Sequence, residues 1–122
     1  MPKEITSTLS RREKSFLNIA KNLAMSSKCR MKHGAVVVSG GSIISLGINS
    51  MKNNPAFISE HHIHDASVHA EVDALRKIKK NIKGGTIYAA RVNRQGNPMI
   101  SRPCDRCYEA IVDAGITKIV YT

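Results

Sequence analysis

Hydrophobic residues recur along this chain with two kinds of spacing, which distinguish helices from strands. Stripes that begin at Phe16 and at Val68 repeat every three or four residues, as on one face of a helix. Residues 35–39 and 43–48 are instead runs rich in β-branched side chains, and the two glycines between them favour a hairpin. The predicted elements, in chain order, are a helix over 10–28, strands over 35–39 and 43–48, a helix over 66–82, a strand over 86–92, a helix over 104–114 and a strand over 118–122.

Local signals support several of these boundaries. Ser10 and Glu13 form the capping-box pattern at the start of the first helix. Gly115 has the position of a residue that ends the third helix. Residues 49–64 and 93–102 are polar, contain proline and lack any periodicity, so we expect loops there.

The order of the elements predicts the fold class. Helices alternate with strands after the hairpin, which implies right-handed crossovers and parallel pairing of the later strands. The length of 122 residues suits one hydrophobic core and is too short for two. We therefore expect a single α/β domain over residues 1–122, a three-layer α/β/α sandwich around a mixed sheet of about four strands. Both later helices would then start at the same edge of the sheet.

Composition indicates a soluble, cytoplasmic protein without a membrane partner. The longest apolar run, residues 35–38, is far too short to span a bilayer, and the first residues lack the pattern of a secretory signal. The chain has three cysteines, an odd number that argues against a framework of disulfides.

The net charge of +10 indicates affinity for phosphates. Residues 1–32 hold eight lysines and arginines against two acids, and residues 76–83 hold five more basic residues with no acid among them. A solvated helix face is the simpler explanation of the second cluster.

Two short motifs carry the candidate chemistry. The first is His69-Ala70-Glu71, and the second is a C-x-x-C pair preceded by proline, with its cysteines at 104 and 107. One imidazole and two thiolates are good zinc ligands, and three protein ligands leave a fourth position open, as in catalytic sites. Cysteines three apart share one face of a helix, and a helix start lowers the pKa of a thiol. The alternative interpretation of the C-x-x-C pair is a thioredoxin-like redox motif. A redox motif does not require an upstream His-x-Glu, so it would leave the first motif unexplained.

Glu71 is the candidate proton shuttle. It lies two residues after His69, which is about 200° around a regular helix, so it would reach the open position rather than the metal. A carboxylate there can move a proton from water to a leaving amine. The alternative is that Glu71 is an ordinary acidic residue in the first turn, which stabilises the helix through a favourable interaction with the helix dipole.

The two motifs together resemble the H-x-E…P-C-x-x-C signature of the zinc-dependent cytidine and deoxycytidylate deaminases. The resemblance extends over about residues 32–122, because the hairpin and the helix order also match. It implies that His69, Cys104 and Cys107 bind one catalytic zinc ion and that Glu71 carries the proton. The implied reaction is hydrolytic attack at C4 of cytosine with release of ammonia.

The resemblance also implies substrate contacts and assembly. Asn49 would hold the sugar, and Ala70 would contact the base through its backbone while its small side chain leaves room for the ring. Relatives usually form homo-oligomers, so we expect one here. Two features depart from the family: the loop over 93–102 is longer than usual, and the sequence stops at Thr122 where nucleotide-type relatives often continue with another strand. We expect that a partner subunit covers the edge strand left there.

Further candidate residues lie outside the motifs. Three histidines before the first motif would form a polar loop over the pocket or a second zinc site. Three arginines flank the long loop and are candidate phosphate binders, since a guanidinium pairs with phosphate in a bidentate manner. Cys29 is expected to be a lone buried thiol, and His33 a local hydrogen-bonding residue. The histidines are His61, His62 and His64, and the arginines are Arg91, Arg94 and Arg102.

These observations favour deamination of a cytosine nucleotide or nucleoside the size of dCMP or cytidine. The low aromatic content, 4%, disfavours an extensive base-stacking platform. The positive charge keeps open a deaminase that acts on a base in single-stranded DNA or RNA, and deamination of a free base, including guanine, also stays open. A zinc-stabilised binding module without catalysis is the alternative from another class of protein.

Overall fold

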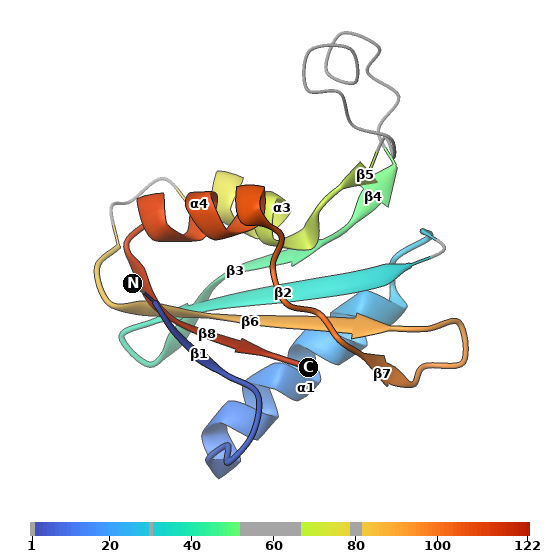
Figure 1. Ribbon diagram of the computed structural model, residues 1–122, viewed down its shortest axis with the longest axis horizontal. Coiled ribbons are helices and arrows are strands. Elements are labelled where there is room, and N and C mark those ends of the chain that lie inside the picture. The colour runs from blue at the N-terminus through green and yellow to red at the C-terminus, as the bar shows by residue number, and fades with distance from the viewer. Residues whose placement is uncertain (1, 30, 52–66, 79–81) are drawn as a thin grey trace, which may run out of the picture.

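The structure is a computed structural model that describes residues 2–29, 31–51, 67–78 and 82–122. Over these residues the chain forms helices and strands in the order drawn in Figure 1. The elements are β1 (Lys3–Ile5), α1 (Arg11–Met25), β2 (Lys32–Ser39), β3 (Ser42–Ile48), β4 (Ser50–Met51), β5 (Ser67–Val68), α3 (Ala70–Arg76), β6 (Gly85–Val92), β7 (Pro98–Met99), α4 (Asp105–Asp113) and β8 (Ile116–Tyr121).

The fold is the expected three-layer α/β/α sandwich around a mixed sheet. The strand order is β1-β8-β6-β2-β3, and β7 pairs with the end of β6. β2 is antiparallel to both β3 and β6, whereas β8 is parallel to β6. α1 covers one face of the sheet, and α3 and α4 cover the other (Figure 1). The sheet has six strands rather than about four, because the short β1 and β7 extend it.

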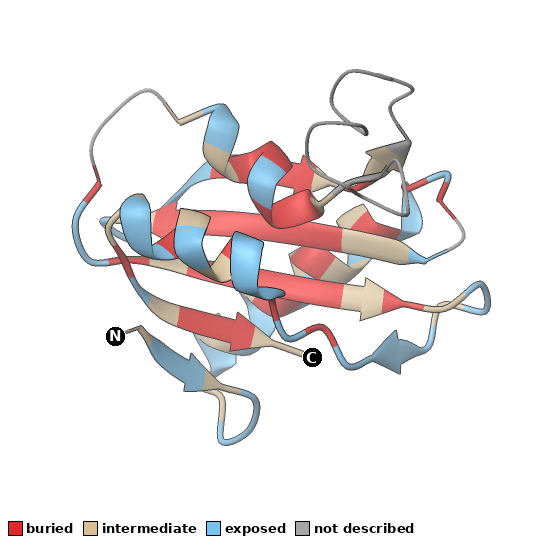
Figure 2. Cartoon of the chain, turned by 45° about the horizontal axis from the view of Figure 1, so that its top comes forward, coloured by how far each residue is buried: buried red, intermediate tan, exposed pale blue. Residues whose placement is uncertain are grey.

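The central strands are buried on both faces and supply two cores (Figure 2). Successive side chains of a strand point to opposite faces. Val36 and Val38 therefore pack toward α1, together with Tyr88 of β6. Ala35 and Val37 pack on the other side, toward α3 and α4. None of the helices in the described part of the chain has the length and apolar character that crossing a bilayer requires.

The capping box predicted for the first helix is present. The Ser10 hydroxyl accepts the Glu13 N–H at 3.1 Å, and the Glu13 carboxylate accepts the Ser10 N–H at 2.9 Å. The helix begins at Arg11 and ends at Met25, three residues before the predicted end.

The second predicted helix is too long at both ends. The sequence predicted a helix over 66–82, whereas α3 extends only from Ala70 to Arg76. The two residues of β5 before it pair antiparallel with β4, which also replaces the start of the predicted 49–64 loop. Likewise, the predicted 93–102 loop contains β7, which pairs with β6.

The edge of β8 is covered by the chain itself. β1 pairs in parallel with β8, with Lys3 opposite Lys118. An ion pair of 3.0 Å between Glu4 and Arg102 ties the same segment to the residues before α4. The expectation that β8 is left as an edge strand is therefore wrong. The edge strand on this side is β1, and its coverage by a partner subunit stays a prediction.

A glycine in β3 lets α3 lie directly on the sheet. A Cβ atom on Gly47 would lie 2.2 Å from the carbonyl oxygen of Ala70 and 2.6 Å from the backbone nitrogen of Ala74. Such distances are too short for any side chain, so only glycine permits this packing. The start of α3, which contains Ala70 and Glu71 of the first motif, is thus fixed against β3.

Candidate active site

The candidate metal ligands lie at the starts of two helices on the same edge of the sheet. His69 is the N-cap residue of α3 and has extended backbone angles, φ −71° and ψ 147°. Cys104 is the N-cap residue of α4, and Cys107 is the third residue of that helix. His69 and Cys104 therefore lie just before their helices, rather than within the first turn as expected.

The structure brings the three donor atoms together. His69 Nδ1 lies 3.3 Å from Cys107 Sγ and 3.6 Å from Cys104 Sγ, and all three donors lie within 4.8 Å of one another. In a tetrahedral zinc site, bonds of about 2.0–2.1 Å to nitrogen and about 2.3 Å to sulfur set the ligand atoms about 3.6 Å apart. The chemistry and spacing of this donor set therefore fit one zinc ion.

The burial of Cys107 affects the protonation of its thiol. Burial raises the pKa of its thiol, and the nearby charges of Glu71 and Cys104 raise it further. These two effects together outweigh the lowering of the thiol pKa that we expected from the start of a helix. A divalent metal ion bound here would counter this effect, because its positive charge would stabilise the thiolate.

Glu71 is buried at the bottom of the site, with 5% of its surface exposed. Because His69 precedes the helix, the angular separation expected from helical geometry does not keep the two side chains apart. Burial raises the pKa of the Glu71 carboxyl, against the lowering effects of its own backbone N–H, the charge of His69 and a hydrogen bond with Cys107. The site thus holds a carboxyl group with raised proton affinity next to one of the candidate metal ligands.

Asn49 lies beside the first motif and is held by backbone groups at the start of β2 and just before it. Its Oδ1 accepts the His33 N–H at 2.9 Å, and its Nδ2 donates to the Met31 carbonyl at 2.6 Å. Ser50 pairs with Val68 in the β4–β5 ladder, so the register extended by one residue sets Asn49 opposite His69. The residue expected to hold the sugar is therefore held in one orientation and lies adjacent to the candidate metal ligand His69.

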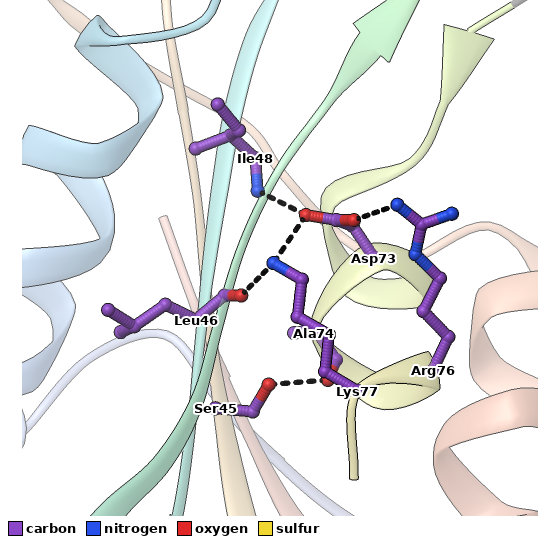
Figure 3. Close-up of polar contacts among 7 residues, drawn as sticks. All are labelled: Ser45, Leu46, Ile48, Asp73, Ala74, Arg76 and Lys77. Atoms are coloured by element: carbon purple, nitrogen blue, oxygen red, sulfur yellow. Dashed lines mark hydrogen bonds and ion pairs between the residues drawn. The ribbon is translucent and has the colours of Figure 1, made fainter. Parts of the chain in front are cut away.

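Sequence reasoning missed a cluster of polar contacts that docks α3 onto β3 (Figure 3). Asp73 accepts the Ile48 N–H at 3.2 Å, Lys77 donates to the Leu46 carbonyl at 2.9 Å, and Ser45 donates to the Ala74 carbonyl at 2.6 Å. Asp73 also pairs with Arg76 at 2.7 Å and with Lys77 at 3.1 Å. The available signal was an acid followed by bases three and four residues later, which is also the ordinary pattern of an exposed helix.

The other residues singled out in the sequence lie at several different places in the structure. Ala70 is fully buried at the start of α3. Arg91 and Arg94 line a groove, whereas Arg102 pairs with Glu4. Cys29 is a free, buried thiol, as expected. The three histidines at 61, 62 and 64 lie outside the described residues.

Comparisons with known proteins find deaminases among the proteins similar to this chain. A tRNA-specific adenosine deaminase of Buchnera aphidicola subsp. Baizongia pistaciae is 32% identical over 88 residues, which are 72% of this chain and 46% of that protein. This chain thus matches less than half the length of that relative. The crystal structure of dCMP deaminase from the cyanophage S-TIM5 in apo form has a TM-score of 0.68 at 26% identity, covering 93% of this chain and 84% of that one.

A second solved structure with a similar fold is a deaminase of a different kind. The guanine deaminase from Bacillus subtilis has a TM-score of 0.58 at 25% identity, covering 93% of this chain and 64% of that one. A family model, the cytidine and deoxycytidylate deaminase zinc-binding region, matches residues 10–122 and so includes both motifs. This chain therefore belongs to the family of deaminases that contain the cytidine and deoxycytidylate deaminase zinc-binding region.

Proposed function

We propose that this domain is a zinc-dependent hydrolase that deaminates a cytosine nucleotide or nucleoside to the uracil form. The observation that carries the proposal is the convergence of three metal-ligand atoms beside a buried carboxyl group. His69, Cys104 and Cys107 would hold the ion, and Glu71 lies next to them, hydrogen-bonded with Cys107. A purely structural zinc site has no need of that carboxyl group.

Glu71 would move the proton in this reaction. Bound zinc would lower the pKa of the attacking water to near neutrality. The water oxygen forms a bond with C4 of the base, the bond from C4 to the exocyclic amine breaks, and ammonia leaves. Glu71 takes the proton from water and gives it to the leaving amine. A raised carboxyl pKa suits this role, because the same group must accept and then release a proton near neutral pH.

Asn49 and Ala70 would position the substrate. The bond to Met31 uses one of the two hydrogens on the Asn49 amide nitrogen, and the other can donate to a sugar hydroxyl. Ala70 lies at the start of α3 and would contact the base through its backbone. Assembly into a homo-oligomer stays a prediction, which analytical ultracentrifugation would test.

The direct test is ammonia release by zinc-loaded protein from dCMP, dCTP, cytidine and deoxycytidine. Glu71→Gln removes the proton carrier and keeps the side-chain shape, so turnover should fall by about 10²- to 10⁴-fold while zinc content is unchanged. Glu109→Gln is the matched control, because Glu109 is exposed on α4. Absence of ammonia from all four compounds would contradict the proposal, and so would a Glu71→Gln variant with full activity.

Deamination of adenosine in RNA is a second candidate function. It is favoured by the 32% identity to a tRNA-specific adenosine deaminase and by the net charge of +10. It predicts that inosine appears in a tRNA substrate and that binding weakens steeply with added salt. A binding module without catalysis, the third alternative, predicts that its function survives Glu71→Gln.

A further inference from the structure

We propose that Arg91 and Arg94 form a subsite for the phosphate of the substrate, so that the preferred substrate is a nucleotide rather than a nucleoside. This inference rests on the proposed function and names the substrate class of the same site. The two arginines line a groove of about 270 Å³ at the end of β6, together with Met31, Gln95 and Met99.

Strand register aligns Arg91 with the residues beside the metal ligands. Arg91 lies opposite His33 in the pairing of β6 with β2. On the other side of β2, Asn49 continues the β3 register and donates its backbone N–H to the His33 carbonyl at 3.2 Å. Arg91, His33 and Asn49 thus form one row across three strands, and the β4–β5 register extends it to His69. Arg91 is therefore two strand spacings, about 10 Å, from Asn49.

The alternation of side chains places Arg91 on the face of the sheet that carries the site. Ile87 of β6 belongs to the core under α3 and α4, whereas Tyr88 and Ala90 belong to the core under α1. With a period of two residues, Arg91 shares the face of Ile87. Met99, which pairs directly with Arg91, shares it too. Arg91 and Met99 therefore lie on the same side of the sheet as the candidate metal ligands, whereas Val92, which also lines the groove, faces α1 by the same alternation.

The turn that carries Arg94 is held in place by its own hydrogen bonds. Asn93 Oδ1 accepts the N–H of Gln95 at 3.0 Å and the N–H of Asn97 at 2.9 Å. The Asn93 backbone N–H donates to the Asn97 carbonyl at 3.0 Å, which closes the turn. A fixed backbone reduces the loss of conformational freedom when the arginine binds a ligand.

Neither arginine is neutralised by a carboxylate in the described part of the chain. The acids that form ion pairs there are Glu4, Glu13 and Asp73, and their partners are other basic residues. Arg102, the third arginine of this region, is the one that Glu4 binds. Two guanidinium groups at one groove can each donate paired hydrogen bonds to a phosphate.

The order of these residues matches the order of groups in a nucleotide. The base would lie at the metal ligands and Glu71, and the sugar would lie at Asn49. The phosphate would then reach the groove beside Arg91. A nucleoside would leave both arginines without a ligand, so the groove discriminates between the two substrate classes.

The test compares kcat/KM for dCMP and deoxycytidine in the zinc-loaded wild type, Arg91→Gln, Arg94→Ala and a control, Arg11→Ala. Arg11 is exposed on α1, across the sheet from the groove, and its loss removes the same charge. The wild type should prefer dCMP at least tenfold. Each groove variant should lose about 10- to 100-fold for dCMP, as expected for one charge-assisted hydrogen bond, and less than about twofold for deoxycytidine. The control should behave as the wild type does.

A binding measurement separates failure of the subsite from failure of the proposed function. Calorimetric titration with dUMP and deoxyuridine requires no turnover, so it applies even if no substrate releases ammonia. Tighter binding of dUMP that both groove variants abolish supports the subsite. Equal affinity for the two compounds, or equal losses for both substrates in the variants, overturns it. Loss of binding to a dC-containing single strand with unchanged constants for dCMP would assign the arginines to a nucleic-acid backbone, and would also overturn the inference.

Discussion

The carboxylate of Asp73 accepts the backbone N–H of Ile48 at 3.2 Å, and this bond joins the helix after His69 to the strand before Asn49. β3 is an edge strand, so its outward backbone groups have no neighbouring strand to pair with. Asp73 and Lys77 bind two of these groups, the Ile48 N–H and the Leu46 carbonyl. The same contacts therefore close the edge of the sheet and fix the site geometry.

Replacing Asp73 should destabilise the fold and loosen the site. Asp73→Ala leaves the part-buried Ile48 N–H without its charged acceptor, which should lower the free energy of unfolding by about 1–3 kcal/mol. Asp73→Asn keeps an acceptor oxygen and loses only ion pairs with half-exposed partners, so its cost should be about 1 kcal/mol or less. Urea unfolding measures both values. Asp113→Ala, at an exposed site on α4, is the control, and an equal loss there would contradict this role of Asp73.

The parts of the fold that local patterns specify were predictable from the sequence. The capping box of Ser10 and Glu13 set the start of α1 within one residue. The β-branched run in β2 and the glycine pair after it predicted the hairpin with β3. These features depend on residues close together in the chain, so periodicity and capping chemistry describe them well.

Features that depend on distant pairing were not predictable. Val68 continues the helical stripe of the following residues, yet it pairs with Ser50 in a two-stranded ladder that ends just before His69. β1 is too short to have a periodicity of its own. It forms because its backbone pairs with β8, where Lys3 lies opposite Lys118 although the two residues are far apart in the sequence. In both cases tertiary pairing overrides the local pattern.

The candidate site also has one part that local sequence patterns predict and one part that depends on pairing between distant strands. Spacing alone identified His69, Cys104 and Cys107, because their chemistry is written in two short motifs. The alignment of Arg91 with Asn49 follows from the registers of separate strand pairs. No spacing along the chain contains that information, so the sequence could name Asn49 and Arg91 as candidates but could not show that they are aligned.

Adding one methyl group at Gly47 should disturb the metal site. In Gly47→Ala the new Cβ would lie 2.2 Å from the Ala70 carbonyl oxygen, so α3 must move away from the sheet. Overpacking of this kind costs about 1–3 kcal/mol or more. Because α3 follows His69, zinc affinity and activity should fall as well. Thermal unfolding and zinc titration measure the two effects.

Gly34→Ala is the matched control for that substitution. Its Cβ would lie 2.1 Å from the Ala20 carbonyl oxygen of α1, so the steric conflict is equal but lies on the opposite face of the sheet. We expect a similar loss of stability with zinc affinity preserved. Equal loss of zinc affinity in both variants would show that general destabilisation, and not the position of α3, governs the metal site.

Metal content should depend on two of the three cysteines. Purified protein should contain one zinc ion per chain, and Cys104→Ser or Cys107→Ser should lower zinc affinity by orders of magnitude, because each removes one of three protein ligands. Cys29→Ala removes a buried thiol outside the cluster and should keep full zinc content. Elemental analysis with a competing chelator measures this. Normal zinc content in Cys107→Ser would refute the proposed ligand set.

Removal of the metal should also lower stability. A ligand that binds only the folded state raises stability in proportion to the logarithm of its concentration over its dissociation constant. A chelator should therefore lower the melting temperature of the wild type by several degrees and leave that of Cys107→Ser nearly unchanged. An unchanged melting temperature in the wild type would exclude tight metal binding to the folded chain.

The docking of α1 on the sheet should be sensitive to acid. Glu13 pairs with Lys118 of β8, and the hydrogen bond from Lys118, followed by the one from the Ser10 backbone, holds the pKa of Glu13 below its ordinary value of 4.5. The unfolded chain then binds the proton more readily than the folded one. The contribution of this pair is complete above pH 4.5 and is lost as the pH falls through the folded-state pKa.

Glu13→Gln tests this sign directly. Glutamine can still accept the Ser10 N–H, so the capping box remains while the titrating charge is lost. We expect the variant to be less stable than the wild type at pH 7 and the difference to shrink below pH 4.5, as measured by urea unfolding across pH 3–7. Glu109→Gln, at an exposed position, should follow the wild type throughout. A difference between Glu13→Gln and the wild type that stays constant with pH would mean that the Glu13 charge contributes nothing to α1 docking.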